Sequence, residues 1–323
     1  MHKMDRRALL AGSFAMGAMT VMDAWAATPR TSAGARFFDR IKRPIGLQIY
    51  TLGDDAGRDL DATFASVAAI GYRDIELPNL YGKSAREVRA AADKAGLAIS
   101  SLHLAASTRG QPVGLSLASP SGEIAETLGA LGASHAVVPI ALMPDNIRPQ
   151  AGENIQLAIA RAFAAAGEDP WKRTAQVVNT AAAALKPAGV HVGYHNHNIE
   201  FARVGTTTGW EILLREFDPA IELEVDVGWI ATAGLDPVAF LAKHRGRVTQ
   251  LHVKDVARDN VTGFGLAMKP AEVGTGKLDW KRILPAAHQA GVKHFYVEQE
   301  PPFAIPRIEA ARKSYAFLSQ LRA

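Results

Sequence analysis

The chain has 323 residues, of which 48% are hydrophobic and 21% are charged, values that are typical of a globular protein with a substantial core. It contains no cysteine, which excludes disulfides, thiolate ligands and a cysteine nucleophile, so any metal ion must be held by nitrogen and oxygen atoms. The net charge is +4, but residues 1–43 carry eight basic and three acidic side chains, which leaves −1 for the remainder. The body of the chain therefore lacks the basic charge that favours nucleic-acid binding.

The first 26 residues resemble an export signal of the twin-arginine type. Arg6 and Arg7 precede an uncharged stretch over 8–22, and Ala24 and Ala26 provide small residues around a cleavage point. The stretch is short and rich in glycine and alanine, which argues against a membrane span, although an anchor that stays attached is the alternative. We expect cleavage after residue 26 and a periplasmic protein without a stable membrane anchor.

From residue 44 onward, apolar strand-like segments alternate with helical patterns, after a predicted tether over 27–43. Strands are predicted over 45–50, 72–77, 97–103, 136–139, 190–197, 221–226, 248–253 and 294–298. Helices are predicted over 60–70, 84–95, 123–131, 154–166, 171–186, 210–216, 237–243, 280–290 and 306–321. Because each return to a parallel strand needs a crossover, these units predict one (β/α)8 TIM barrel over residues 44–323. A glycine-rich phosphate turn does not follow the first strand, which argues against a dinucleotide-binding open sheet.

Histidines and carboxylates gather at the ends of the last four predicted strands. The fifth strand ends with His195 and His197, the sixth with Asp226, the seventh near His252 and the eighth with Glu298. Burying such groups at a barrel mouth is costly unless they pair with one another or bind an ion. The sequence predicts one divalent ion held by His195, Asp226, His252 and Glu298, with Mn²⁺ as the first expectation and Zn²⁺, Co²⁺ or Fe²⁺ as alternatives. The competing interpretation is a salt-bridged cluster without a metal.

Other polar and aromatic residues are predicted at the same end of the barrel. Gln48 and Tyr50 lie near the end of the first strand, Glu76 ends the second, and Trp229 follows the sixth. We expect these four to bind substrate, with Trp229 stacking on a sugar ring, although packing and ion pairing are the alternatives for Trp229 and Glu76. His103 ends the third strand and is a candidate acid, base or hydroxyl-binding residue, or a cap for the following loop.

Six segments carry a family resemblance: IGLQIYTLGD, YHNHNIEF, ELEVDVGWI, LHVKD, VGTGKLDW and VEQEPP. Together they resemble the xylose-isomerase-like barrels of the sugar phosphate isomerase/epimerase family, which is related to the type IV AP endonucleases. The resemblance covers residues 44–320 and implies a metal held by Glu, Asp, His and Glu from successive strand ends. By position the last three fall on Asp226, His252 and Glu298, whereas the first falls on His195, where many members have a glutamate. The YHNH motif is similar to that of exported members linked to 3-keto-sugar and inositol metabolism.

The resemblance implies an enzyme that acts on a small carbohydrate with neighbouring hydroxyl and carbonyl groups. The ion would bind both oxygens, and a side chain would remove the adjacent proton to give an enediolate. Our first interpretation is a metal-dependent isomerase or epimerase acting on a keto sugar or related polyol. Glu298 would serve as ligand and base, with His197, Lys254 or His103 as acid/base partners.

Three other functions compete with this interpretation. Epimerases of this family use the first and last glutamates as a pair of bases, and only Glu298 remains here, so a lyase acting on 3-keto-glycosides or inososes with the same metal site is an alternative. A periplasmic sugar-binding barrel without activity is a second alternative. AP endonuclease activity is disfavoured because the body of the chain is near neutral. An exported location also argues against phosphorylated substrates.

Overall fold

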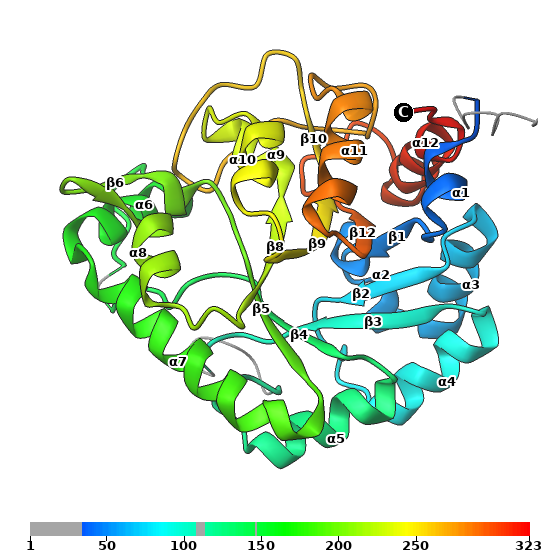
Figure 1. The fold of residues 1–323 in the computed structure, drawn as a ribbon, viewed down its shortest axis with the longest axis horizontal. Coiled ribbons are helices and arrows are strands. Elements are labelled where there is room, and N and C mark those ends of the chain that lie inside the picture. The colour runs from blue at the N-terminus through cyan, green and yellow to red at the C-terminus, as the bar shows by residue number, and fades with distance from the viewer. Residues whose placement is uncertain (1–33, 108–113, 146) are drawn as a thin grey trace, which may run out of the picture. The chain divides into compact units, whose positions relative to one another are not determined.

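The computed structural model describes residues 34–107, 114–145 and 147–323, which belong to a compact unit over Ala33–Ala323. In this part of the chain, eight parallel strands close into a barrel in the order β1-β12-β9-β8-β5-β4-β3-β2 (Figure 1). The barrel strands are β1 (Gly46–Gln48), β2 (Asp74–Leu77), β3 (Ala98–His103), β4 (His135–Val138), β5 (His191–His195), β8 (Glu222–Asp226), β9 (Val248–Val253) and β12 (His294–Val297). The predicted TIM barrel is confirmed, and the last four predicted strands are neighbours in the closed sheet.

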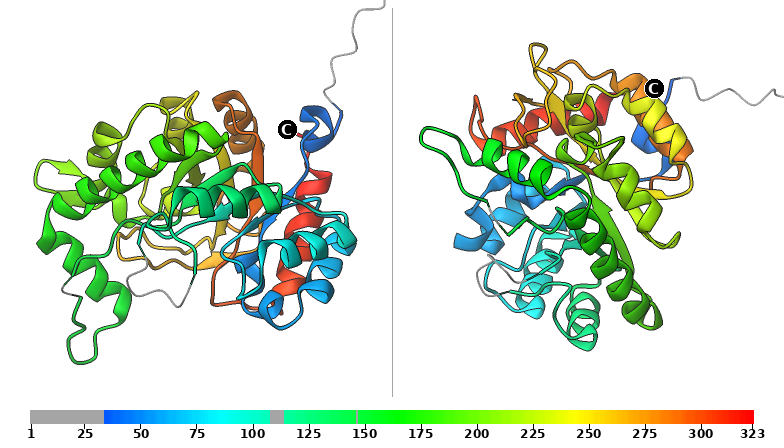
Figure 2. Two further views of the ribbon diagram at one scale, coloured as in Figure 1. Left: turned by 90° about the horizontal axis from the view of Figure 1, so that it is seen from below. Right: turned by 90° about the vertical axis from the view of Figure 1, so that its left-hand side faces the viewer.

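Helices surround the strands, as two further views show (Figure 2). They are α1 (Phe37–Ile41), α2 (Asp55–Arg58), α3 (Leu60–Ile70), α4 (Ala85–Ala95), α5 (Ser121–Leu131), α6 (Ile155–Ala166), α7 (Asp169–Leu185), α8 (Gly209–Glu216), α9 (Val227–Thr232), α10 (Pro237–Lys243), α11 (Trp280–Ala290) and α12 (Arg307–Gln320). Local chemistry sets several of their ends. Ser84 and Glu87 form a reciprocal capping box at the start of α4, and Gly96 ends that helix in the left-handed conformation.

The barrel strands alternate between an apolar outer face and a polar inner face. Because successive strand residues point to opposite faces, the buried apolar residues of each strand pack against the helices. These residues include Leu47, Ile75, Leu223, Val225, Leu251, Val253, Phe295 and Val297. The intervening buried residues face the barrel interior and are polar: Gln48, Glu76, Ser101, Glu224, Gln250 and His252. The barrel therefore encloses hydrogen-bonding and ionisable side chains.

Several short elements differ from the predicted pattern. The first strand stops at Gln48 because its Oε1 accepts a hydrogen bond from the Tyr50 amide at 3.0 Å, which starts the 3-10 helix Ile49–Leu52. The fifth strand ends at His195, so His197 lies beyond it. The sequence pattern also missed 3-10 turns and two small antiparallel ribbons, which are η2 (Lys186–Ala188), η3 (Ile199–Phe201), β6 (Arg203–Val204) with β7 (Thr207–Thr208), and β10 (Asp255–Val256) with β11 (Pro270–Ala271).

The predicted tether needs a correction over residues 34–43. This segment contains α1, which lies beside α12 in both views of Figure 2, and the Phe37 amide donates to the Leu321 carbonyl at 2.8 Å. Phe37 and Phe38 are buried against the ring of Phe295. Burying two phenyl rings contributes roughly 3–6 kcal/mol before the entropy of ordering the segment is subtracted. The aromatic pair explains why this segment packs on the barrel.

The predicted export signal over residues 1–26, and the start of the tether over 27–33, lie outside the described residues. Among the helices of the described part, none combines the length and apolar character that crossing a membrane requires.

A buried carboxylate organises the segment that follows β9. Asp255 is fully buried, and its Oδ2 accepts hydrogen bonds from the Gly274 amide (2.9 Å), the Gly276 amide (3.3 Å) and the Trp280 indole Nε1 (2.9 Å). The carboxylate thereby ties the loop after β11 and the start of α11 to the end of β9. This explains the VGTGKLDW segment structurally, since its glycine amides point at Asp255.

Replacing Gly276 by alanine tests this arrangement. An added Cβ would collide with Asp255 Oδ1 and the Val256 carbonyl oxygen, so we expect Gly276→Ala to lower the free energy of unfolding by about 1–3 kcal/mol or more. Gly129→Ala, on the exposed face of α5, is the matched control and should be neutral or stabilising by about 0.5–1 kcal/mol. Urea unfolding measures both variants, and equal stability of the two would contradict the close contact at Gly276.

His244, at the end of α10, should make stability depend on pH. Burial lowers the pKa of His244 to about 4, and its neutral Nε2 accepts the Trp210 Nε1–H at 3.4 Å. The unfolded chain takes up this proton near pH 6.5, so the stabilisation is complete above that pH and is lost as the pH falls towards 4. Between pH 7 and 4.5 the wild type should lose about 2 kcal/mol more than His244→Gln in urea unfolding. An identical loss would contradict a neutral buried His244.

Candidate metal centre

The four predicted metal ligands meet at the carboxyl end of the barrel. His195 and Asp226 are the last residues of β5 and β8, His252 is the penultimate residue of β9, and Glu298 directly follows β12. The register between β8 and β9 pairs Asp226 with His252. One potential ligand atom from each side chain lies within 4.8 Å of the others, and none of the four residues is more than 6% exposed. We call this set the carboxylate position.

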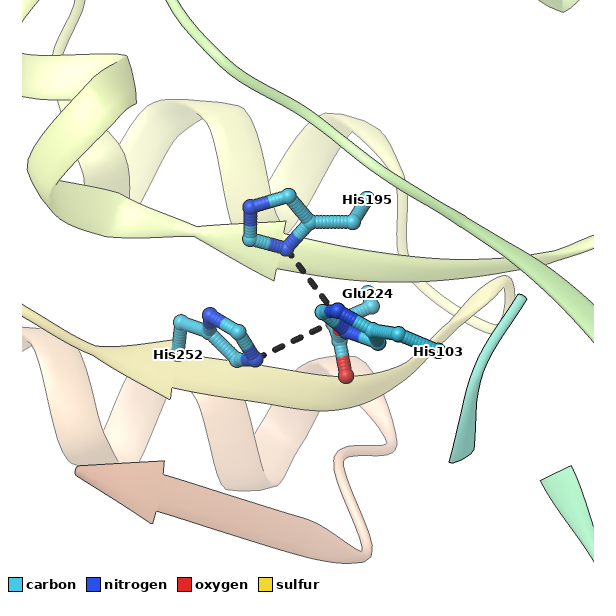
Figure 3. A group of neighbouring side chains, drawn as sticks. All are labelled: His103, His195, Glu224 and His252. Carbon is cyan, nitrogen blue, oxygen red and sulfur yellow. Dashed lines mark hydrogen bonds and ion pairs between the residues drawn. The ribbon is translucent and has the colours of Figure 1, made fainter. Parts of the chain in front are cut away.

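A second set of ligand atoms surrounds Glu224, two residues before Asp226 on β8 (Figure 3). Glu224 Oε2 lies 3.0 Å from His103 Nε2, 3.1 Å from His195 Nδ1 and 3.3 Å from His252 Nε2. The rings of all three histidines point towards this carboxylate in Figure 3, and the four ligand atoms again lie within 4.8 Å of one another. We call this set, His103, His195, Glu224 and His252, the three-histidine position.

His252 belongs to both positions and offers a different ring nitrogen to each. Its Nδ1 lies 2.9 Å from Glu298 Oε2 and 3.7 Å from Asp226 Oδ2. Its Nε2 lies 2.6 Å from Glu76 Oε2 and 3.3 Å from Glu224 Oε2. Whichever nitrogen binds a cation, a carboxylate can accept the proton on the other nitrogen, which is the usual support for a metal-binding histidine.

Gln48 and Glu76 form a buried hydrogen-bond network that reaches His252. Both are fully buried, and Gln48 Nε2 donates to Glu76 Oε2 at 2.8 Å while Ser101 Oγ donates to Glu76 Oε1 at 2.6 Å. Glu76 in turn accepts from His252. Their burial and mutual hydrogen bonds argue for holding His252, rather than for the substrate contact that the sequence predicted.

Lys254 is buried among three carboxylates. Its Nζ lies 2.9 Å from Asp226 Oδ2, 2.7 Å from Glu298 Oε2 and 2.6 Å from Glu300 Oε1, and its side chain is fully buried. Although burial opposes charge, the three carboxylates raise the pKa of Lys254 well above its usual value. The chain makes room for this side chain at Gly228, where an added Cβ would lie 2.8 Å from Lys254 Cγ. Two oxygens of the carboxylate position therefore already contact an ammonium group.

The histidines of the centre differ in protonation. Burial lowers the pKa of a histidine, but Glu76 and Glu224 raise the pKa of His103 to about 10. Glu224 also overcomes burial at His252 and raises its pKa well above the usual value. At His195, burial and the neighbouring His252 lower the pKa well below the usual value. The lowered pKa favours the neutral imidazole at His195, the form that binds metal ions, whereas the raised pKa values of His103 and His252 favour their charged forms.

The charge of the centre favours a bound cation. Its carboxylates are those of Glu76, Glu224, Asp226, Glu298 and Glu300, and Lys254 provides an ammonium. Buried carboxylates need compensation, so the remaining positive charge must come from protonated imidazoles or from a metal ion. Three imidazole nitrogens converging on one carboxylate oxygen are also the donor set that a divalent transition metal prefers. The residues present therefore fit a divalent metal ion.

In the HNHN sequence after Tyr194, the two histidines lie at or beside the metal centre, and the two asparagines form hydrogen bonds to the surrounding backbone. Asn196 is fully buried and exchanges hydrogen bonds with the backbone of Asp226, accepting from its amide at 3.1 Å and donating to its carbonyl at 3.3 Å. Asn198 donates to the Gly263 carbonyl at 2.8 Å and accepts from the Leu266 amide at 3.0 Å. The two asparagines thus fix the end of β8 and the loop after β10 relative to the histidines.

His197 and Trp229 lie beside the ligands. The His197 ring is 4.9 Å from that of His195 and 5.2 Å from that of Trp229, and burial lowers the pKa of His197 to about 3. The Trp229 ring is 2% exposed and lies 5.0 Å from Lys254 Nζ. The predicted stacking of Trp229 on a sugar is not supported, because its ring packs on the ammonium instead.

Tyr50 is an aromatic side chain that remains accessible near the mouth. It is 45% exposed, and burial of the rest of the side chain, together with Glu300 and Glu298, raises its pKa. Tyr50 thus stands near the carboxylates that end β12 and keeps its predicted substrate-binding role as a prediction.

A cavity of about 520 Å³ adjoins the three-histidine position. His103 lines it together with apolar residues, such as Pro78, Leu80, Leu102 and Leu115, and polar ones, which are Asn79, Tyr81, Lys83 and Ser116. A cavity of this size accommodates a group of roughly the dimensions of a ring.

Two residues important to the centre were missed as functional residues by the sequence analysis. The strand-end pattern singled out neither Glu224 nor Glu300. A signal existed for both, because each lies two residues from a predicted ligand, and strand alternation places such residues on the same face. The sequence alone did not show that β3 and β8 bring His103 next to Glu224.

Comparison with known proteins supports the barrel fold. The model of the family described as "Xylose isomerase-like TIM barrel" matches residues 64–321. A sugar phosphate isomerase/epimerase from Parabacteroides distasonis has 26% identity and a TM-score of 0.62, with 86% of this chain and 94% of that chain covered. A second structure of that description from the same organism has 23% identity and a TM-score of 0.66, covers 85% and 96%, and shows the shared fold.

Curated relatives match over a shorter stretch. An inosose dehydratase from Geobacillus thermodenitrificans is 28% identical over 167 residues, which span 47% of this chain and 55% of that protein. One from Clostridium tetani is 29% identical over the same shares. The chain thus spans about half the length of the curated relatives it matches. On the family model and the closed barrel together, the chain belongs to the xylose isomerase-like TIM barrel family.

Proposed function

We propose that this protein is a divalent-metal-dependent lyase that eliminates water or an alcohol from a keto sugar or an inosose. The observation that carries the proposal is the joint arrangement of two features at the barrel mouth. Imidazoles and carboxylates converge at the barrel mouth, and Glu300 lies beside them, 25% exposed and paired with the buried Lys254. The first feature fits a Lewis-acid site, and the second fits a proton acceptor within reach of a bound substrate.

A divalent ion in the centre would polarise the substrate carbonyl and so acidify the neighbouring C–H bond. Glu300 removes that proton, and the C–H electron pair passes into an enediolate of the substrate. The bond from the next carbon to its oxygen then breaks, and the leaving oxygen takes the proton from Glu300 to depart as water or an alcohol. Lys254 is fully buried, so it acts by holding and charge-balancing Glu300 rather than by contacting the substrate.

Elimination suits the centre better than epimerisation for a geometric reason. Two-base epimerisation needs proton-transfer groups on opposite sides of the substrate, whereas Glu298 and Glu300 both follow β12 and both contact Lys254. Glu298 is also engaged by His252 and is 6% exposed, which reduces its suitability as the base that the sequence suggested. A carboxylate that first accepts and then returns a proton on one face can support elimination.

The names of the relatives support the substrate class. Inosose dehydratases, which eliminate water, are among the matched curated relatives, although the match spans about half their length. The cavity beside His103 leaves room for a leaving group larger than water, which favours a keto-glycoside. An export signal would place the enzyme in the periplasm and favour an unphosphorylated substrate.

Isomerisation or epimerisation of a keto sugar is the second candidate. It is favoured by the similarity to a sugar phosphate isomerase/epimerase at 26% identity over most of both chains. His103 and His197 would then have to supply the second proton-transfer group.

Metal binding should depend on the two histidines shared by both candidate positions. We expect His195→Ala and His252→Ala to weaken Co²⁺ or Mn²⁺ binding by more than the roughly 10–100-fold that loss of a supporting residue costs. His288→Ala, on an exposed site of α11, is the control and should bind as the wild type does. Isothermal titration of the chelator-treated protein measures the affinities. Unchanged binding in both variants would contradict a metal centre at this end of the barrel.

The role of Glu300 can be tested with ketoses, inososes and 3-keto-glycosides in heavy water, followed by proton NMR. Wild type should release water or an alcohol, and Glu300→Gln should slow both this release and deuterium exchange beside the carbonyl by about 10²–10⁴-fold. Glu309→Gln, which alters a surface pair with Arg312 on α12, should leave both rates unchanged. An inverted or isomerised product that keeps all its oxygens would favour the second candidate, and binding without exchange would favour a sugar-binding protein.

A further inference from the structure

We propose that the amino end of the barrel holds a second metal site, in which His135, His191 and Glu222 bind a divalent transition-metal ion such as Zn²⁺. These are the first residues of β4, β5 and β8, so they lie at the end of the barrel opposite the mouth. His191 and His195 are the two ends of β5 and are roughly 13 Å apart along the strand. The site is therefore separate from the centre at the mouth and does not depend on the proposed function.

The barrel interior is polar at this end. Asp74 and His294, the first residues of β2 and β12, lie there with the three proposed ligands. The ring of His135 is 5.2 Å from that of His294, although β4 and β12 are not neighbours in the closed sheet, so this contact crosses the interior. Branched apolar side chains ordinarily fill the interior layers of a TIM barrel. Imidazoles and carboxylates in their place are costly to bury and must be compensated by hydrogen bonds or by an ion.

The strand register places two of the histidines side by side. His135 of β4 pairs with His191 of β5, and neighbouring strands are about 4.8 Å apart. Their rings lie 5.2 Å apart and are inclined by 24°. Both side chains contact the carboxylate of Glu222, so they occupy the same face of the sheet. Two imidazoles on one face of adjacent strands are within reach of a single ion.

Glu222 provides the third ligand. Its Oε1 lies 2.9 Å from His191 Nδ1, and its Oε2 lies 3.3 Å from His135 Nε2. Zn²⁺ binds histidine nitrogen and carboxylate oxygen at about 2.0–2.2 Å in tetrahedral sites, which places the ligand atoms roughly 3–3.5 Å apart. The carboxylate is already close to that separation from both imidazoles. His191, whose side chain is 54% exposed, turns towards His135 when the ion enters between them.

Neighbouring groups orient the buried ligands. His135 Nδ1 can donate to the Ser100 carbonyl at 3.3 Å and to Ser134 Oγ at 3.1 Å, which leaves Nε2 directed at Glu222. Thr249 Oγ1 donates to Glu222 Oε2 at 2.7 Å. A histidine that donates its other ring N–H to a backbone carbonyl, beside a hydrogen-bonded carboxylate, is the usual support around a bound metal.

The site is partly buried and partly open to solvent. His135 is 7% exposed, whereas the side chain of His191 reaches solvent, which leaves room for water at the remaining coordination position. Imidazole ligands favour Zn²⁺, Cu²⁺ or Ni²⁺ over Mg²⁺ or Ca²⁺. An ion there ties together the starts of three barrel strands. Because a ligand that binds only the folded chain stabilises it by mass action, the thermal midpoint of unfolding should rise with free Zn²⁺.

Titration calorimetry with Zn²⁺ on the full, chelator-treated chain tests the site. His191→Gln and His135→Gln should each weaken one Zn²⁺ site by more than about 10–100-fold, since loss of a supporting residue alone costs that much. His195→Ala, which removes a ligand at the mouth, should retain this site. His288→Ala, at an exposed position of α11, is the matched control and should bind as wild type does. Circular dichroism establishes that each variant is folded, and His191→Gln alters an exposed side chain if His135→Gln is unstable.

A crystal grown with Zn²⁺ and recorded at its absorption edge provides a second measurement. We expect an anomalous peak between His135 and His191. The thermal midpoint should rise with Zn²⁺ in His195→Ala but not when His191→Gln is added to it. Unchanged Zn²⁺ binding in both His135→Gln and His191→Gln, or no peak at the amino end, would show that the cluster is only a hydrogen-bonded network. Loss in His191→Gln with retention in His135→Gln would assign the ion to a surface histidine and overturn the proposed site as well.

Discussion

The structure depends on how the barrel mouth compensates buried negative charge. Carboxylates from β2, β8 and the end of β12 meet in a region that is almost closed to water, and one lysine balances three of them. The imidazoles at the ends of β3, β5 and β9 surround the others. Because isolated buried charges are so unfavourable, the cluster forms only with its cations in place. The same requirement is the reason we propose that the cluster binds a metal ion and transfers protons.

The scaffold gives this cluster its geometry without contributing to its chemistry. The parallel arrangement brings the carboxyl ends of β5, β8, β9 and β12 to the same end of the closed barrel. The asparagines that follow β5 fix the neighbouring strand and loop. Asp255 anchors the segment between β9 and α11, directly after Lys254. A supporting shell of this kind keeps ligand atoms within a few tenths of an ångström, which metal binding and catalysis both need.

Much of this could be predicted from the sequence, and the limits have physical causes. Alternation of strand and helix patterns predicted the barrel, and strand ends predicted that His195, Asp226, His252 and Glu298 meet, because parallel strands share their carboxyl end. The burial of Gln48, Glu76 and Trp229 could not be predicted, because it depends on packing between strands that are distant in sequence. Phe37 and Phe38 pack against Phe295, more than 250 positions away, so no local pattern revealed that α1 belongs to the barrel.

The most direct test of the central claim is anomalous diffraction from a crystal grown with Co²⁺, recorded on both sides of the metal absorption edge. A barrel mouth that compensates its carboxylates with a metal ion predicts one strong peak within bonding distance of nitrogen atoms of His195 and His252. An anomalous map without a peak there, with Lys254 and the histidines in their present hydrogen bonds, would contradict the account.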